Sequence, residues 1–146
     1  MNKPRHNKNQ NQTLGAFGED LAQKAVLERG WHLVARNWRY SRLGELDLIA
    51  YDATRECLHI IEVKTRHSSQ SQTTGRAIEA VTPAKQAKIR QLAELFLAEQ
   101  HTDLAENGPY SGISERGPIT DLSLDVITVE CDARQHWHVE LVENAF

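Results

Sequence analysis

The spacing of apolar residues first predicts a helix near the N-terminus. Apolar positions recur every three or four residues from about Leu14 to Arg29, the period of an amphipathic helix. Thr13 is a suitable N-terminal cap, and Gly30 suits the left-handed position that commonly ends a helix. The apolar face of this helix is expected to contain Leu14, Phe17, Leu21 and Ala25.

A second helix is predicted in the middle of the chain, from Pro83 to about Gln100. Thr82 can cap it, and proline is favoured at the first helical position because its missing N–H would be unpaired there in any case. Its apolar positions follow helical spacing and are expected to face the core: Ile89, Leu92, Ala93 and Phe96.

Five further runs have the composition of β-strands and lie at 31–40, 45–52, 57–66, 122–130 and 136–142. The first three are joined by short connections, which predicts an antiparallel meander. The resulting order, αβββαββ, predicts an α/β sandwich in which helices flank a mixed sheet. The polar residues 1–12 are expected to form a disordered arm, and residues 101–120, rich in Gly and Pro, a mobile loop within a single domain at 13–146.

Length and composition are those of one globular domain. The chain has 146 residues, of which 25% are charged, and it contains no apolar run near the roughly 20 residues that span a bilayer. The N-terminus lacks the apolar segment of a secretory signal, and Cys57 and Cys131 stand far apart. We therefore expect a cytoplasmic protein with two free thiols and no membrane association.

Charge is distributed unevenly along the chain. Residues 1–90 contain 15 Lys and Arg against 9 Asp and Glu, whereas residues 91–146 contain 2 against 11. A basic half is typical of a surface that meets a polyanion, although an unevenly charged solvated surface explains the same counts.

Charged residues also occur inside two of the predicted strands. Residues 44–50 read GELDLIA and residues 62–66 read EVKTR, which places Asp47, Glu62 and Lys64 among apolar neighbours. Alternate strand residues share a face, so Glu62 and Lys64 point the same way, and pairing of the two strands would bring Asp47 beside Glu62. Neighbouring carboxylates repel each other unless a cation lies between them, and such oxygen ligands suit Mg²⁺ or Mn²⁺.

This pattern favours phosphodiester hydrolysis but does not establish it. Lys64 beside a metal could orient or deprotonate the attacking water and stabilise charge on the phosphate. A Glu-x-Lys triplet alone is expected by chance about 0.5 times in such a chain, and a surface ion pair on an edge strand is the plain alternative. For Glu45 a turn or ion-pair role is favoured over a metal-binding one.

Four motifs in order resemble a known family. They are GAFGEDLA at 15–22, GELDLIA at 44–50, EVKTR at 62–66 and VTPAKQAKI at 81–89. Together they resemble the YraN-like family of small bacterial predicted endonucleases, within the PD-(D/E)XK restriction-endonuclease-like superfamily that includes Holliday-junction resolvases. The resemblance covers roughly residues 14–130.

The resemblance implies a restriction-endonuclease-like αβββαβ core with one extra C-terminal strand. It also implies a metal site at Glu19, Asp47 and Glu62, with Lys64 as a catalytic residue beside these acids. The chain departs from the family where Ser123-Leu124-Asp125-Val126 replaces an expected Arg-Phe-Asp-Val. The Asp is kept as Asp125, whereas Ser123 stands where the family pattern has an arginine.

Basic and polar residues near these motifs are candidates for phosphate contact. The first turns of the second helix carry three of them, where backbone amides favour anions; Arg36, with Trp38 and Tyr40, belongs to the same hypothesis. The full set of nucleic-acid candidates is Arg39, Arg42, Arg66, Lys85, Gln86 and Lys88. Solvated arginines and core tryptophans are the alternative.

Three functions are compatible with these observations. The first is a nuclease dependent on Mg²⁺ or Mn²⁺ that acts on nucleic acid, with DNA favoured over RNA as the substrate. Selectivity for DNA structure and a homodimer are both compatible with this function. The second is a non-catalytic DNA- or RNA-binding module of the same fold. The third is a protein-interaction domain that uses the acidic C-terminal part.

Overall fold

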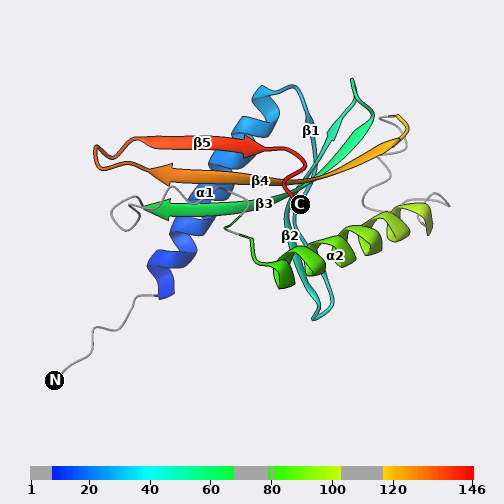
Figure 1. Cartoon of the computed structure of the whole chain (residues 1–146), viewed down its shortest axis with the longest axis horizontal. Helices are drawn as coiled ribbons and strands as arrows, with labels where there is room; N and C mark the ends of the chain where they lie inside the picture. The colour runs from blue at the N-terminus through cyan, green and yellow to red at the C-terminus, as the bar shows by residue number, and fades with distance from the viewer. Residues whose placement is uncertain (1–7, 68–78, 80, 103–116) are drawn as a thin grey trace.

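The predicted order of elements is confirmed (Figure 1). The computed structural model describes residues 8–67, 79, 81–102 and 117–146. The elements are α1 (Lys8–Glu28), β1 (His32–Tyr40), β2 (Gly44–Asp52), β3 (Cys57–His67), α2 (Pro83–Thr102), β4 (Asp121–Cys131) and β5 (Trp137–Val142). The strands form one sheet in the order β1-β2-β3-β4-β5, in which β3 and β4 are parallel and the other neighbours antiparallel.

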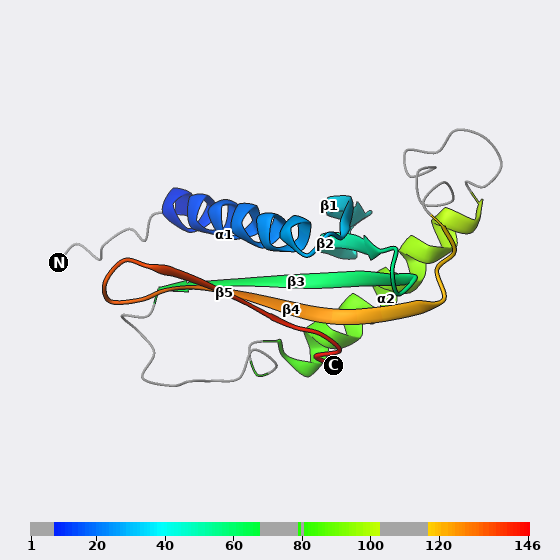
Figure 2. The same ribbon diagram turned by 90° about the horizontal axis from the view of Figure 1, so that it is seen from above.

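The two helices pack on opposite faces of the sheet and create two cores. Figure 2 shows α1 on one side of β3 and β4, with the first turns of α2 on the other. Ala22 and Val26 of α1 pack in one core with Leu48 and Ile61. The α2 stripe of Ile89, Leu92, Ala93 and Phe96 is fully buried in the other core, as predicted.

The boundaries and buried face of α1 differ from the prediction. The helix begins at Lys8, so the cap at Thr13 and disorder over all of residues 1–12 are wrong; residues 1–7 lie outside the described part. The face nearest the sheet is Gly18, Ala22 and Val26, whereas Phe17 is 42% exposed. Small residues occupy this face because α1 lies very close to β3: a Cβ atom at Gly18 would come within 1.8 Å of Thr65 Oγ1.

The other helix ends follow their predicted signals. Gly30 has a φ of 81°, the left-handed conformation expected after α1. Thr82 Oγ1 accepts a hydrogen bond of 3.2 Å from the Lys85 backbone N–H at the start of α2. Most of the loop expected at 101–120 lies outside the described residues, and α2 extends to Thr102.

β2 and β3 pair over only part of their length and then separate. In Figure 1 the β1–β2 hairpin crosses the direction of the other three strands. Pairing of β2 with β3 runs from Asp52–Cys57 to Leu48–Ile61 and then stops. The next residues along the two strands are Asp47 and Glu62, so both acids lie where the strands separate.

Both cysteines are buried free thiols, as predicted. None of the described helices combines the length and hydropathy needed to cross a membrane.

Candidate active site

Asp47 lies at the point where β2 and β3 separate. Its Oδ2 accepts a hydrogen bond of 2.8 Å from the Val63 backbone N–H, a donor that regular strand pairing no longer satisfies. The side chain is half-buried. Burial, followed by repulsion from Glu62, raises the pKa of Asp47 from 3.8 to about 7, although the Val63 N–H opposes this shift. A nearby cation would therefore favour the ionised form of Asp47.

Glu62 is buried and is approached by two lysines. Its side chain is 5% exposed, and its Oε1 lies 3.1 Å from Lys64 Nζ and 3.6 Å from Lys85 Nζ. Lys64 shares the strand face of Glu62, whereas Lys85 comes from the first turn of α2. Because both lysines keep about a third of their side chains exposed, each can also reach a ligand in solvent.

Glu19 approaches the same region from α1. Its Oε2 lies 3.2 Å from a terminal nitrogen of Arg36 and accepts a hydrogen bond of 3.1 Å from Asn37 Nδ2. Repulsion from Glu19 also contributes to the raised pKa of Asp47. Arg36, grouped from the sequence with the phosphate-binding candidates, is instead occupied by Glu19, Asp20 and Gln23.

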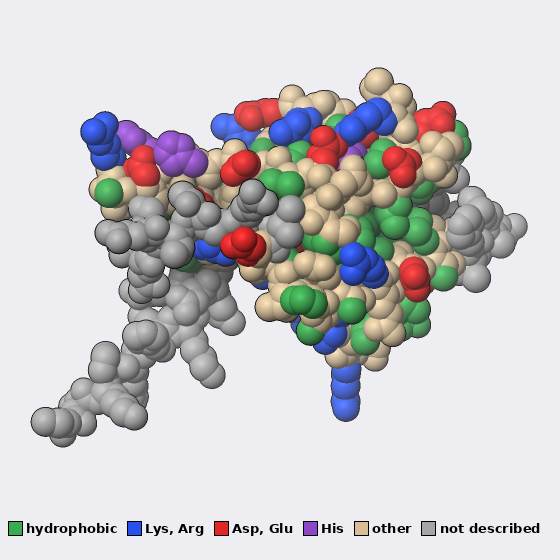
Figure 3. Space-filling model, in the orientation of Figure 1, with side chains coloured by type: hydrophobic (Ala, Val, Ile, Leu, Met, Phe, Trp, Pro, Cys, Tyr) green, Lys and Arg blue, Asp and Glu red, His purple; other side chains and the backbone are tan. Residues whose placement is uncertain are grey.

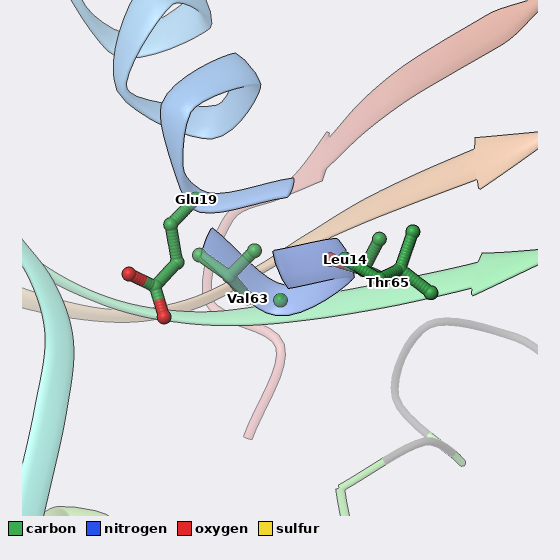
Figure 4. A pocket seen from close by; sticks show the side chains of 5 residues that line it. Leu14, Glu19, Val63 and Thr65 are labelled. Carbon is green, nitrogen blue, oxygen red and sulfur yellow. The ribbon is translucent and has the colours of Figure 1, made fainter. Parts of the chain in front are cut away.

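A hollow lies beside the contact between the N-terminal half of α1 and β3. It has a volume of about 250 Å³ and is lined by Leu14, Gly15, Glu19, Val63 and Thr65. Figure 4 shows the Glu19 side chain extending from α1 toward β3 beside Val63. The hollow therefore gives solvent access to the side of the sheet on which Glu19 lies.

The acids can serve a magnesium site of the open type. Within the described ranges, no three His, Cys, Asp or Glu side chains are already arranged around a common metal position. Mg²⁺, however, usually takes only one or two protein carboxylates and keeps several water ligands. Asp47 and Glu62 supply such a pair of hard oxygen donors, and their repulsion is the feature that a cation would relieve. The donor chemistry therefore fits Mg²⁺ or Mn²⁺, with Glu19 as an additional nearby acid.

The nucleic-acid candidates fall into two groups. Some already have partners: Arg39 lies 2.7 Å from Glu45, as expected for an ion-paired Glu45, and Gln86 Nε2 donates to the Val81 carbonyl at 3.0 Å. Among the described residues, no ion pair engages Arg42, Arg66 or Lys88. On the face drawn in Figure 3, Lys and Arg side chains are interspersed with Asp and Glu. That face is therefore mixed in charge.

The sequence did not predict a buried polar network that joins β3 to β4. His59 and Asp125 are both 0% exposed, and His59 Nδ1 lies 2.6 Å from Asp125 Oδ2. Asp125 Oδ1 also accepts from the Ser123 hydroxyl and, at 3.0 Å, from the Asn144 backbone N–H. The His59 ring stacks on Trp31 with centroids 3.7 Å apart. The signal available in the sequence was a polar residue within each of two apolar strands, but 66 positions separate the partners.

His136 and His138 both lie near Asp132. His138 Nε2 is 2.8 Å from Asp132 Oδ2 and His136 Nδ1 is 3.7 Å from it. The three side chains thus form a local contact at the β4–β5 turn.

The fold defines the class of protein. A mixed five-stranded sheet with one helix on each face is consistent with a restriction-endonuclease-like core, and the Asp47, Glu62 and Lys64 positions lie at its strand separation. The chain belongs to the uncharacterised protein family UPF0102, whose model matches residues 18–136. This is the YraN-like family that the four sequence motifs indicated, so that resemblance is confirmed.

Individual relatives agree with this assignment. A UPF0102 protein of Nocardia farcinica is 47% identical over 102 residues, covering 70% of this chain and 71% of the relative. One from Rhodococcus opacus is 48% identical over 89 residues, covering 61% and 70%. One from a Mycobacterium strain is 45% identical over 85 residues, and there the match spans 58% of this chain and 60% of the relative, less than two thirds of its length.

Proposed function

We propose that this protein is a metal-dependent endonuclease that hydrolyses phosphodiester bonds in DNA. The observation that carries the proposal is the juxtaposition of Asp47 with Glu62 where β2 and β3 separate, with Lys64 Nζ 3.1 Å from Glu62. Repulsion from Glu62 raises the pKa of Asp47, and a bound cation would relieve that repulsion. Lys64 and Lys85, which lie beside Glu62 and are partly exposed to solvent, favour an anionic ligand.

Each residue has a role that follows from its place. Asp47 and Glu62 would hold Mg²⁺ or Mn²⁺, which when bound acts as a Lewis acid on the phosphate and lowers the pKa of a coordinated water. Lys64 would donate hydrogen bonds to the attacking water or the phosphate oxygens and stabilise the charge that develops there. Glu62 orients Lys64 through their ion pair. Lys85, with the amides at the start of α2, offers a second contact for a phosphate.

A non-catalytic DNA- or RNA-binding module is the second candidate. The observation that favours it is that Lys64 and Lys85 both lie within 3.6 Å of Glu62, so this acid is charge-compensated by the protein itself. In that case the acids and lysines would form a structural cluster beside a phosphate-binding surface. A bound metal and hydrolysis distinguish the two functions.

The test combines metal binding with cleavage. Calorimetry should detect Mn²⁺ binding to the wild type and to Lys64→Ala, but not to Asp47→Ala, with Asp132→Asn at the distant β4–β5 turn as the control. Branched, flapped, single-stranded and duplex DNA should be cut by the wild type, with the rate about 10² to 10⁴ lower in Lys64→Ala. A wild type that binds these DNAs and cuts none of them with either metal would support the binding module. Equal cutting by Lys64→Ala would remove Lys64 from the mechanism.

A further inference from the structure

Asn37 has an unusual backbone conformation inside β1. Its φ is 52°, in the left-handed region that costs energy for residues other than glycine and that Asn tolerates better than most. Strained positions of this kind concentrate at functional sites, where the surrounding structure maintains them. The contacts of Asn37 therefore indicate what its conformation serves.

The register of the sheet places Asn37 in line with the candidate acids. Arg36 pairs with Leu48 and Trp38 with Leu46, so Asn37 lies opposite Asp47 between these pairs. Asp47 and Glu62 follow the last β2–β3 pair. Asn37 thus lies across the β1–β2 pair from Asp47, at the point where β2 and β3 separate.

The Asn37 side chain reaches Glu19. Its Nδ2 donates a hydrogen bond of 3.1 Å to Glu19 Oε2, the same oxygen that lies 3.2 Å from Arg36. Arg36 is itself held by Asp20 at 2.6 Å, by Gln23 at 3.2 Å and by the Ala16 carbonyl at 3.3 Å. Both donors use one Glu19 oxygen, Oε2, and no hydrogen bond or ion pair joins Oε1 to another of the described residues.

We propose that Asn37 is a positioning residue, which together with Arg36 holds the Glu19 carboxylate toward Asp47 so that Glu19 contributes to cation binding. This inference rests on the proposed function. Without the two donors, the Glu19 side chain would be free to rotate along the exposed part of α1 and would spend less time near the acid pair. Arg36 also carries a charge that opposes a nearby cation, whereas Asn37 is neutral, so Asn37 gives the cleaner test.

Asn37→Gly is the informative variant because glycine adopts a positive φ without strain, while the whole side chain, including the amide that donates to Glu19, is removed. We expect Mn²⁺ affinity, measured by calorimetry, to fall about 10-fold, the scale of losses when a residue that orients a metal ligand is removed. Ser41→Gly is the matched control, since Ser41 also has a positive φ, 49°, and lies in the β1–β2 turn. Its Mn²⁺ affinity should equal that of the wild type, and thermal unfolding should show both variants folded.

A double-variant cycle separates positioning from a general structural effect. Glu19→Gln should weaken Mn²⁺ binding, and adding Asn37→Gly to it should cause no further loss, because the residue being positioned is already neutral. Asn37→Gly with unchanged or tighter Mn²⁺ binding, or an equal loss in the Glu19→Gln background, would overturn the positioning role. A wild type that binds no Mn²⁺ would overturn the proposed metal site itself, and this inference with it.

Discussion

The carboxylate of Asp47 accepts a hydrogen bond of 2.8 Å from the backbone N–H of Val63, at the point where regular pairing of β2 with β3 ends. A side chain thus replaces the strand as the hydrogen-bond partner. This exchange lets β2 turn away from β3 without leaving Val63 N–H unpaired, and it keeps Asp47 beside Glu62. The separation of the strands and the placement of the acids have a common cause.

The first prediction concerns the stability cost of Asp47 in the absence of metal. Its pKa is raised from 3.8 to about 7, so the folded state retains a proton that the unfolded state loses between these values. Stability should therefore decrease as pH rises through this window, and Asp47→Asn should be the more stable protein above pH 7. Its amide oxygen can still accept from Val63 N–H. The gain corresponds to at most about 4 kcal/mol.

Chemical unfolding in EDTA at pH 5 and pH 8 tests this directly. The difference between Asp47→Asn and the wild type should be larger at pH 8. Mn²⁺ should stabilise the wild type at pH 8 and leave Asp47→Asn little changed. A wild type at least as stable as Asp47→Asn at pH 8 would show that the carboxylate is already compensated within the protein.

The second prediction concerns the close packing of α1 on β3. In Gly18→Ala the new Cβ would lie 1.8 Å from Thr65 Oγ1 and 2.8 Å from Thr65 Cβ, so the helix or strand must move. We expect a loss of about 1 to 3 kcal/mol in the free energy of unfolding. Thr65→Gly in the same chain should restore part of this loss, because it removes both atoms.

Gly15→Ala is the matched control for this variant. Gly15 belongs to the same helix, and a Cβ there meets nothing within 4 Å. Alanine is the better helix former, so Gly15→Ala should be neutral or stabilising. Equal destabilisation by the two glycine substitutions would place the effect in the helix rather than in its contact with Thr65.

The behaviour of α1 shows where sequence patterns were informative and where they were not. The strands and α2 were predictable because alternation, Thr82, Pro83 and an apolar stripe act locally. The buried face of α1 was not, because helical spacing favoured the large residues Leu14 and Phe17. The buried face contains Gly18 and Ala22 instead, because α1 lies too close to β3 for large side chains. That distance depends on tertiary packing, which helical spacing does not reveal.

The candidate site shows the same division. Strand alternation alone placed Glu62 and Lys64 on one face, and the meander brought Asp47 near them. The attachment of Glu19 to Arg36 and Asn37 depends on how α1 crosses β1, which no local pattern encodes. From the sequence, Arg36 was indistinguishable from the exposed arginines that follow it.

The third prediction concerns the His59–Asp125 network. Asp125→Ala removes the carboxylate partner of His59 in a region where neither residue has solvent access. It also removes one of two acceptors for the Ser123 hydroxyl and for the Asn144 N–H, which keep a contact of 3.2 Å with each other's residue. Buried groups left without partners are costly, and we expect a loss of roughly 3 to 5 kcal/mol. Thermal or urea unfolding measures it. Asp132→Ala, which removes a solvent-accessible partner of His138, should cost much less; a comparable loss there would contradict the importance of burial.

The fourth prediction concerns the basic side chains that the described structure leaves without ion pairs. Each phosphate contact releases counterions, so oligonucleotide affinity should fall steeply with salt, and removing one contact should reduce the slope of log K against log salt by about 0.9. Arg42→Ala and Lys88→Ala should each show this change. Arg39→Ala should show less, because Arg39 is already paired with Glu45 at 2.7 Å.

The charge-matched control is Arg134→Ala, which removes an exposed arginine of the acidic C-terminal half. Fluorescence anisotropy between about 50 and 200 mM salt makes the comparison; if Arg134→Ala lowers the slope as much as Arg42→Ala, the effect reflects net charge, and Arg42 and Lys88 make no specific phosphate contact.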